Sequence, residues 1–175
     1  MWLNGPSRPR TLTQATLGQI PDGEPGASST LYAMRDLVRA AVRDPAQKVR
    51  ETAISIFRAA SVSGFVDEAR ALQQWVKTNI TYMRDPPDVE LVQTPQKTLE
   101  YGRGDCDDQA TLLASLLMAT GHPARFVAIG LKGQPLSHVL VQTLIGPNWL
   151  GAETIIDKPF GWMPAGVTST RILKV

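Results

Sequence analysis

The spacing of the apolar residues changes once along the chain, near Arg125, and this change sets the fold class. Between Ser29 and Gly121, apolar residues recur every three or four positions, which is the period of helices that pack one face on a core. After Arg125 they alternate with polar residues, as in strands with one buried face. Helices followed by strands predict an α+β architecture, and 175 residues are enough for one domain with a full core.

Three helices are expected before residue 85, each marked by a capping residue or by a Pro or Gly break. They are a helix capped by Ser29 or Thr30, one that begins at Pro45 and one that begins at Phe65. Residues 85–103 are expected to form a structured loop, because Leu91, Val92 and Leu99 offer it apolar anchors. A fourth helix follows and contains the only cysteine, Cys106.

The segments 126–131, 138–145 and 149–156 are predicted to be three successive antiparallel strands. Residues 146–148, Gly-Pro-Asn, turn the last pair, and a three-residue turn there pairs Ile145 with Trp149. Residues 171–175 are expected to add an edge strand. The predicted core is thus a cysteine helix packed on an antiparallel sheet.

Residues 1–28 differ in composition from the rest of the chain. They contain four prolines and four glycines and show little apolar periodicity. Such a segment cannot form a core of its own. We therefore expect an extended N-terminal arm, 1–28, in front of a domain that comprises residues 29–175.

Cys106 stands on the first turn of the most apolar helix, with Asp105 as its expected N-cap and Asp108 as the capping-box partner. Unpaired N–H groups and the helix dipole favour a thiolate at this position, which is one way to make a cysteine nucleophilic. Asp105, Asp107 and Asp108 act in the opposite direction, because negative charges raise the pKa of a thiol. A single cysteine cannot form an intramolecular disulfide.

His138 opens a predicted strand, and Glu153 lies on the next one, four residues after Trp149. A thiolate that attacks a carbonyl, an imidazole that transfers protons and an acid that orients it make up an acyl-transfer triad. Asp157 is the alternative to Glu153 as the acid. A three-residue turn at 146–148 sets His138 opposite Ile156, which is next to Asp157. His122 is not expected to be the base, since it lies at the far end of the cysteine helix, about 20 Å from the thiol.

Three segments resemble the motifs of the transglutaminase-like superfamily. Residues 104–117, followed by 121–125, resemble its cysteine motif, and residues 137–141 resemble its histidine strand. Residues 148–153 are similar to its acid strand, where aspartate is usual and this chain has Glu153. The resemblance implies a papain-like core and either transamidation or hydrolysis of an amide through a thioester, with Cys106, His138 and Glu153 as the triad.

The Gly-Asp-Cys-Asp-Asp form at 104–108, with Tyr82, Asp85 and Pro95 upstream, is most similar to small versions of this domain from tailed phages and prophages. There such domains accompany tail or baseplate proteins. The resemblance implies a peptide, isopeptide or cell-wall peptide as substrate. The alternative is a non-catalytic scaffold in a phage tail tip that docks on other tail proteins through residues 1–28.

Composition limits the partners and the location. The net charge of +2 does not favour nucleic acid or a membrane surface, and no stretch approaches the roughly 20 apolar residues of a membrane span. The N-terminus lacks the apolar core of a signal peptide. We expect the host cytoplasm or a virion tail as the location. No cofactor or metal is expected, because the chain has no phosphate loop, zinc pattern or dinucleotide motif.

Overall fold

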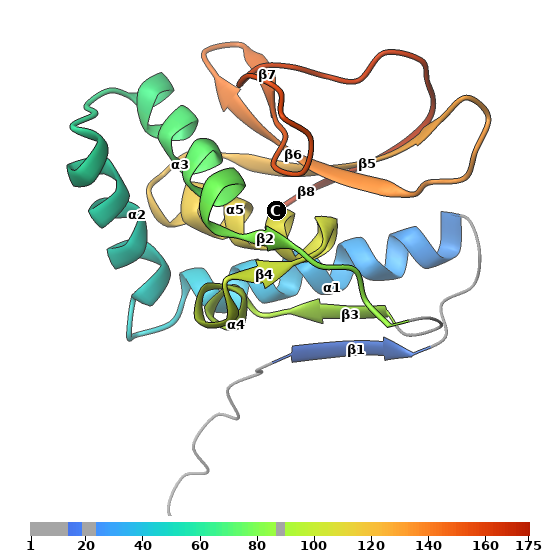
Figure 1. The fold of residues 1–175 in the computed structure, drawn as a ribbon, viewed down its shortest axis with the longest axis horizontal. Helices are drawn as coiled ribbons and strands as arrows, with labels where there is room; N and C mark the ends of the chain where they lie inside the picture. The colour runs from blue at the N-terminus through green and yellow to red at the C-terminus, as the bar shows by residue number, and fades with distance from the viewer. Residues whose placement is uncertain (1–13, 19–23, 87–89) are drawn as a thin grey trace, which may run out of the picture.

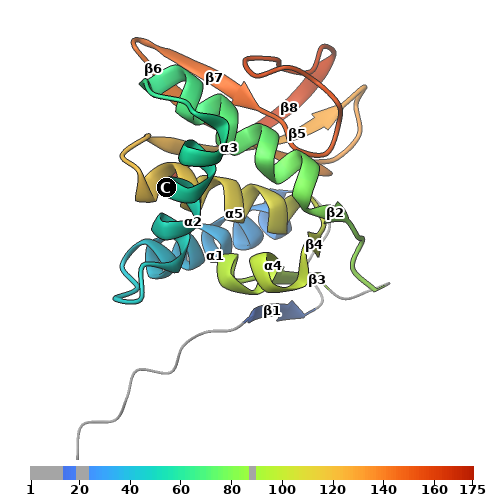
Figure 2. The same ribbon diagram turned by 60° about the vertical axis from the view of Figure 1, so that its left-hand side comes forward.

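Helix α5 (Cys106–Ala119) is the central element of the computed structural model, which describes residues 14–18, 24–86 and 90–175. It lies between a four-stranded sheet and helix α1 (Glu24–Val42), as both views show (Figures 1 and 2). All its residues from Asp107 to Leu117 are buried. A helix covered on several sides needs apolar or small side chains nearly all round. This explains the run of Ala and Leu residues that follows the cysteine.

The sheet has the strand order β7-β6-β5-β8, and all neighbouring strands are antiparallel. Its strands are β5 (Ala124–Leu131), β6 (His138–Ile145), β7 (Asn148–Ala152) and β8 (Val167–Lys174). Side chains such as Phe126 and Val141 join the core that contains α5. On the opposite face, Ile129 and Leu140 form a smaller cluster with Met163. The side chains of β5 and β6 are therefore largely buried on both faces.

Apart from these, the described residues form three further helices and four short strands. They are the helices α2 (Lys48–Ala60), α3 (Phe65–Asn79) and α4 (Pro95–Tyr101), and the strands β1 (Gln14–Gly18), β2 (Thr81–Tyr82), β3 (Glu90–Gln93) and β4 (Arg103–Gly104). Strand β1 pairs antiparallel with β3, and β2 pairs parallel with β4. The second pairing brings the end of α3 next to the residues that lead into Cys106.

The α+β class with a helix on an antiparallel sheet is confirmed, but two predicted helix starts were wrong. Helix α1 begins at Glu24 rather than at Ser29 or Thr30, so residues 24–28 are helical and not extended. The first turn of a helix tolerates proline, and one stands there at position 25. Helix α2 begins at Lys48, because Asp44 first closes a turn that includes Pro45. Residues 1–13 and 19–23 lie outside the described residues, and the division at residue 28 stays a prediction.

Residues 85–103 are not only a loop, since they contain β3 and α4. Thr94 caps α4 by accepting the backbone N–H of Lys97 at 3.2 Å, and Pro95 occupies its first turn. A helix of seven residues is too short to show a clear apolar period. The capping signal was present in the sequence, but periodicity alone could not reveal this helix.

The register of the last hairpin differs from the prediction by one residue. Its turn has two residues, and Ile145 pairs with Asn148 instead of Trp149. Gly146 has a φ of 57°, which a glycine adopts without strain. Strand β7 ends at Ala152, four residues earlier than expected. The predicted edge strand is confirmed as β8 and begins earlier, at Val167.

Within the described ranges, no helix combines the length and the apolarity that crossing a membrane requires.

Candidate active site

The first turn of α5 is fixed by a capping box, as the sequence predicted. Asp105 Oδ1 accepts the backbone N–H of Asp107 at 3.0 Å and that of Asp108 at 3.3 Å. In return, Asp108 Oδ2 accepts the backbone N–H of Asp105 at 3.4 Å. These bonds satisfy N–H groups that a helix start leaves unpaired. They also fix the backbone from which the Cys106 side chain projects.

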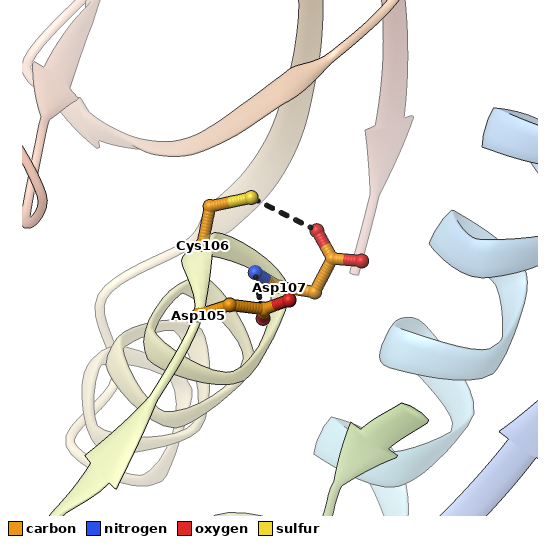
Figure 3. Close-up of side chains that lie close together, drawn as sticks. All are labelled: Asp105, Cys106 and Asp107. Carbon is orange, nitrogen blue, oxygen red and sulfur yellow. Dashed lines mark hydrogen bonds between the residues drawn. The ribbon is translucent and has the colours of Figure 1, made fainter. Parts of the chain in front are cut away.

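The Cys106 thiol is partly buried and points towards Asp107, with its sulfur 3.5 Å from Asp107 Oδ1 (Figure 3). The backbone N–H of Val139 also hydrogen-bonds to this sulfur. Burial raises the pKa of the thiol well above its ordinary value, and the charges of Asp107 and Asp105 raise it further, against the effect of the Val139 N–H. In this arrangement the thiol keeps its proton. The sequence indicated the effect of the acids but not the larger effect of burial.

His138 is the first residue of β6 and directly precedes Val139, so it stands next to the residue that contacts the sulfur. Its Nε2 lies 2.8 Å from Glu153 Oε2. The histidine side chain is one-fifth exposed, while that of Glu153 is almost fully buried. Because Glu153 occupies Nε2, Nδ1 is the ring nitrogen that remains for a proton from Cys106.

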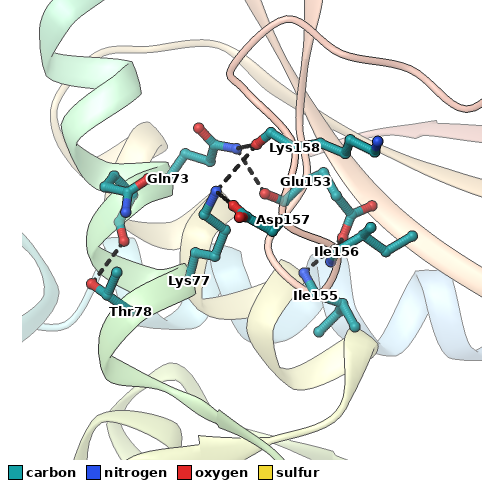
Figure 4. A network of polar contacts seen from close by, with 9 residues as sticks. Gln73, Lys77, Thr78, Glu153, Ile155, Ile156, Asp157 and Lys158 are labelled. Atoms are coloured by element: carbon teal, nitrogen blue, oxygen red, sulfur yellow. Dashed lines mark hydrogen bonds and ion pairs between the residues drawn. The ribbon is translucent and has the colours of Figure 1, made fainter.

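Glu153 is held at both its carboxylate and its backbone. Its Oε1 accepts the N–H groups of Ile155 at 2.7 Å and Ile156 at 3.2 Å. Its carbonyl oxygen accepts Gln73 Nε2 from helix α3 at 2.7 Å (Figure 4). Burial acts to raise the pKa of Glu153, but the hydrogen bond and charge of His138 and the two N–H groups outweigh it and lower the pKa. The carboxylate is therefore ionised and rigidly placed beside the imidazole.

Asp157, the other candidate acid, lies apart from His138. Its carboxylate pairs with Lys77 Nζ at 2.8 Å, and its side chain is 98% exposed (Figure 4). The two-residue turn and the early end of β7 explain this position, because the chain leaves the sheet before Asp157. The structure thus brings His138 together with Glu153 and leaves Asp157 in a surface ion pair.

A buried carboxylate connects the cysteine helix to strand β3. Asp108 accepts the backbone N–H of Gln93 at 2.7 Å and its Nε2 at 2.6 Å. Gly104 passes so close that a Cβ there would lie 2.5 Å from the Cβ of Asp108. Burial raises the pKa of Asp108 to about 7, against the Gln93 hydrogen bond. This contact sets the position of β3 relative to the first turn of α5.

The sequence analysis did not identify Gln73 and Gln93. Gln73 hydrogen-bonds to the carbonyl oxygen of Glu153, and Gln93 hydrogen-bonds to the carboxylate of Asp108. Gln73 is 2% exposed and stands in α3 next to Leu72 and near Val76, both fully buried. A polar residue inside an apolar helical stripe was the signal that could have revealed it. Gln93 gave no comparable signal, because its partner Asp108 is fifteen positions away and its strand is short.

Asp105, Cys106 and Asp107 place one donor atom each within 4.8 Å of one another (Figure 3). Helix capping already accounts for Asp105, whose Oδ1 accepts two backbone N–H groups. His122 lies at the other end of α5, where its Nε2 is 2.9 Å from the carbonyl oxygen of Phe65 and its ring stacks on the Phe65 ring. Its contacts are those of a buried structural histidine.

Comparisons with known proteins agree with the fold. A family model described as the transglutaminase-like superfamily matches residues 50–166, about two thirds of the chain. A candidate protease from Parabacteroides distasonis has a similar structure, with a TM-score of 0.57 and 12% identity over 89% of this chain and 32% of that one. A candidate cysteine protease from Cytophaga hutchinsonii gives a TM-score of 0.53 and 14% identity over 93% of this chain and 63% of that one.

The chain spans less than two thirds of the length of either of these proteins. At such identities the likeness is one of fold. No curated protein matches the chain.

Proposed function

The chain belongs to the transglutaminase-like superfamily, and from this premise we propose that it is a thiol acyl-transfer domain acting on an amide bond of a peptide or isopeptide. In this proposal Cys106 is the nucleophile, His138 is the general base and acid, and Glu153 orients the imidazole. The observation that carries the proposal is the 2.8 Å contact between His138 Nε2 and a carboxylate oxygen of the buried Glu153. His138 begins strand β6, and the residue after it, Val139, contacts the Cys106 sulfur.

The hydrogen bond between Glu153 and one nitrogen of His138 determines which nitrogen can take the thiol proton. The ionised Glu153 accepts the Nε2–H of His138, which leaves the Nδ1 lone pair free to take the thiol proton. Because the thiol is protonated at rest, its proton leaves as the sulfur attacks the carbonyl carbon and the C–S bond forms. The backbone N–H of Cys106, at the helix start, would stabilise the oxyanion.

The tetrahedral adduct then collapses. The C–N bond breaks, His138 returns its proton to the leaving amine, and a thioester remains on Cys106. Water or a second amine attacks the thioester in the same way, which releases an acid or a new amide and restores the thiol. A cell-wall peptide is the substrate class that the sequence resemblance suggests.

The alternative is a non-catalytic scaffold of a phage tail that docks through residues 1–28. One observation favours it: the Cys106 sulfur faces Asp107, and burial and acidic neighbours raise its pKa. The phage association, like the location in the host cytoplasm or a virion tail, is based only on the sequence resemblance.

Acylation of Cys106 separates the two proposals. The protein is mixed with a p-nitrophenyl ester of a short peptide, and mass spectrometry measures the acyl group on the cysteine peptide over time. The proposal expects acylation in the wild type and at least about a hundredfold lower rate in His138→Ala, the lower end of general-base effects. Absence of acylation, or equal rates in both proteins, would support the scaffold instead.

A further inference from the structure

The segment that follows β7 carries the proposed orienting acid, and one side chain of helix α3 joins its two ends. Strand β7 ends at Ala152, and Glu153 is the residue after it. Gln73 Nε2 donates to the carbonyl oxygen of Glu153 at 2.7 Å and to that of Lys158 at 3.3 Å (Figure 4). Where the strand ends, the amide of Gln73 therefore takes over in fixing the backbone of the segment 153–158.

Gln73 is itself firmly placed. The residue is 2% exposed, and Leu72 and Val76 beside it on α3 are fully buried in the main core. The two carbonyls fix the orientation of the amide, because turning it round would set its oxygen against two other oxygens. Both hydrogen bonds join residues at least 80 positions apart. They therefore connect the helical half of the chain to the half that contains the sheet.

The position of this segment decides whether the acid meets the imidazole. Glu153 Oε1 accepts the N–H groups of Ile155 and Ile156, which belong to the same segment. Its Oε2 lies 2.8 Å from Nε2 of His138, which stands on β6. The contact with His138 thus depends on where the segment lies relative to the sheet. Gln73 fixes the segment at Glu153 itself, the residue that makes this contact.

Lys77, one turn later on α3, contacts only the far end of the segment. Its Nζ lies 2.8 Å from Asp157 Oδ1 and 3.2 Å from the carbonyl oxygen of Lys158. The side chain of Asp157 is 98% exposed, and ion pairs at the surface contribute little. The position of Glu153 therefore depends on Gln73 more than on Lys77.

We propose that Gln73 is a positioning residue of the proposed active site. By fixing the backbone of Glu153 it keeps the carboxylate on His138 Nε2, and so keeps the imidazole in the tautomer whose Nδ1 can take the proton of Cys106. The inference rests on the proposed acyl-transfer function. Without the amide of Gln73, the carbonyl oxygen of Glu153 loses its donor, the segment shifts, and the imidazole populates both tautomers.

The tautomer of His138 tests this role directly, because nitrogen NMR distinguishes a ring nitrogen that carries a proton from one that does not. The chain has two histidines, and a His138→Ala variant assigns their signals. At pH 9, where an imidazole is ordinarily neutral, the wild type should carry the proton on Nε2. Gln73→Met keeps the size of the side chain without its donor, and the signals of the two His138 nitrogens should move towards each other. Those of His122, whose Nε2 contacts the carbonyl oxygen of Phe65, should stay in place.

The acylation rate of Cys106 gives a second readout. With the p-nitrophenyl ester, Gln73→Met should react at least about threefold more slowly than the wild type. Gln142→Met is the matched control, because Gln142 is also a buried glutamine and its side chain bonds to Arg125 and Met163 on β6 and its surroundings. This control should change the rate less than about twofold.

Because Gln73 acts through Glu153, the effects of the two substitutions should not add. In a Glu153→Gln background the carboxylate is already lost, so Gln73→Met should slow acylation less than about twofold further. A role in general stability would give the same loss in both backgrounds. If Gln73→Met does not fold, Gln73→Asn takes its place. Its shorter side chain draws the amide back from the Glu153 carbonyl and should shift the tautomer in the same direction.

The outcomes for the function and for Gln73 are distinct. No acylation of the wild type, or acylation that is unaffected by His138→Ala, would contradict the proposed function. Acylation that requires His138, with the His138 ring signals unchanged in Gln73→Met, would leave the function standing and overturn the role of Gln73. A loss of rate no larger than that of Gln142→Met, or one that is equally large in the Glu153→Gln background, would also overturn it.

Discussion

At the scale of single residues, the site depends on how one carboxylate reaches one imidazole. Glu153 lies just past the end of β7, and its side chain extends to His138 Nε2 while its other oxygen binds two backbone N–H groups. A shorter aspartate at this position could not keep all three contacts without moving the backbone. The length of the glutamate side chain therefore fits the position where this strand ends.

Substitution of Glu153 tests this interpretation. Glu153→Gln keeps the shape but loses the charge that stabilises a protonated His138, and we expect the acylation rate of Cys106 to fall at least about tenfold. Asp157→Asn is the matched control at the neighbouring acid and should change the rate less than about twofold, since surface ion pairs contribute little. Equal losses in both variants, measured by acyl-group mass, would argue against Glu153 as the orienting acid.

Asp107 should lower the reactivity of the Cys106 thiol. Its charge raises the pKa of the Cys106 thiol, so Asp107→Asn should lower that pKa and increase the rate of iodoacetamide labelling at pH 7. The expected increase is at least about threefold, because the loss of one neighbouring charge commonly shifts a pKa by half a unit or more. Glu100→Gln, at an acid that pairs with Lys97 on α4, is the control and should have no effect. An unchanged or slower rate in Asp107→Asn would contradict this role.

At the scale of elements, Asp108 should make the attachment of β3 to α5 depend on pH. The folded protein raises the pKa of Asp108 from 3.8 to about 7, so it binds this proton more tightly than the unfolded chain does. The contribution of this group to the free energy of unfolding therefore falls as pH rises from about 4 to about 7, and is constant above.

Chemical denaturation at pH 5 and pH 8 measures this effect. The wild type should lose more stability between the two pH values than Asp108→Asn, whose side chain does not titrate. Asp108→Asn should also be less stable at both, because Gln93 loses an acceptor. Identical pH dependence in the two proteins would mean that Asp108 has no raised pKa.

The sequence could predict those elements whose signals are local. The capping box, the cysteine helix and the positions of Cys106 and His138 follow from spacing and from residue type. The register of the β6–β7 hairpin could not be predicted, because the alternation of apolar and polar residues does not determine how many of residues 146–148 belong to the turn. The same limit left Glu153 and Asp157 unresolved, since the choice between them depends on where β7 leaves the sheet.

At the scale of the whole molecule, stability should be concentrated around α5. Leu113 is fully buried in the main core, so Leu113→Ala should lower the free energy of unfolding by about 2–5 kcal/mol. Leu131→Ala, at a leucine of β5 that is 38% exposed, should cost about 0.5 kcal/mol or less. Urea denaturation of both variants checks the contrast, and similar losses would argue against the central position of α5.

The central claim is that Cys106 and His138 act as one unit, and the pH dependence of Cys106 alkylation tests it most directly. The rate of iodoacetamide labelling is measured by mass spectrometry from pH 5 to pH 9 in the wild type and in His138→Ala. The variant should react only through free thiolate, so its rate should rise about tenfold per pH unit. The wild-type rate should exceed that of the variant at least about tenfold at pH 7, because His138 takes the thiol proton as the sulfur attacks. Two superimposed curves that both rise throughout would contradict the account.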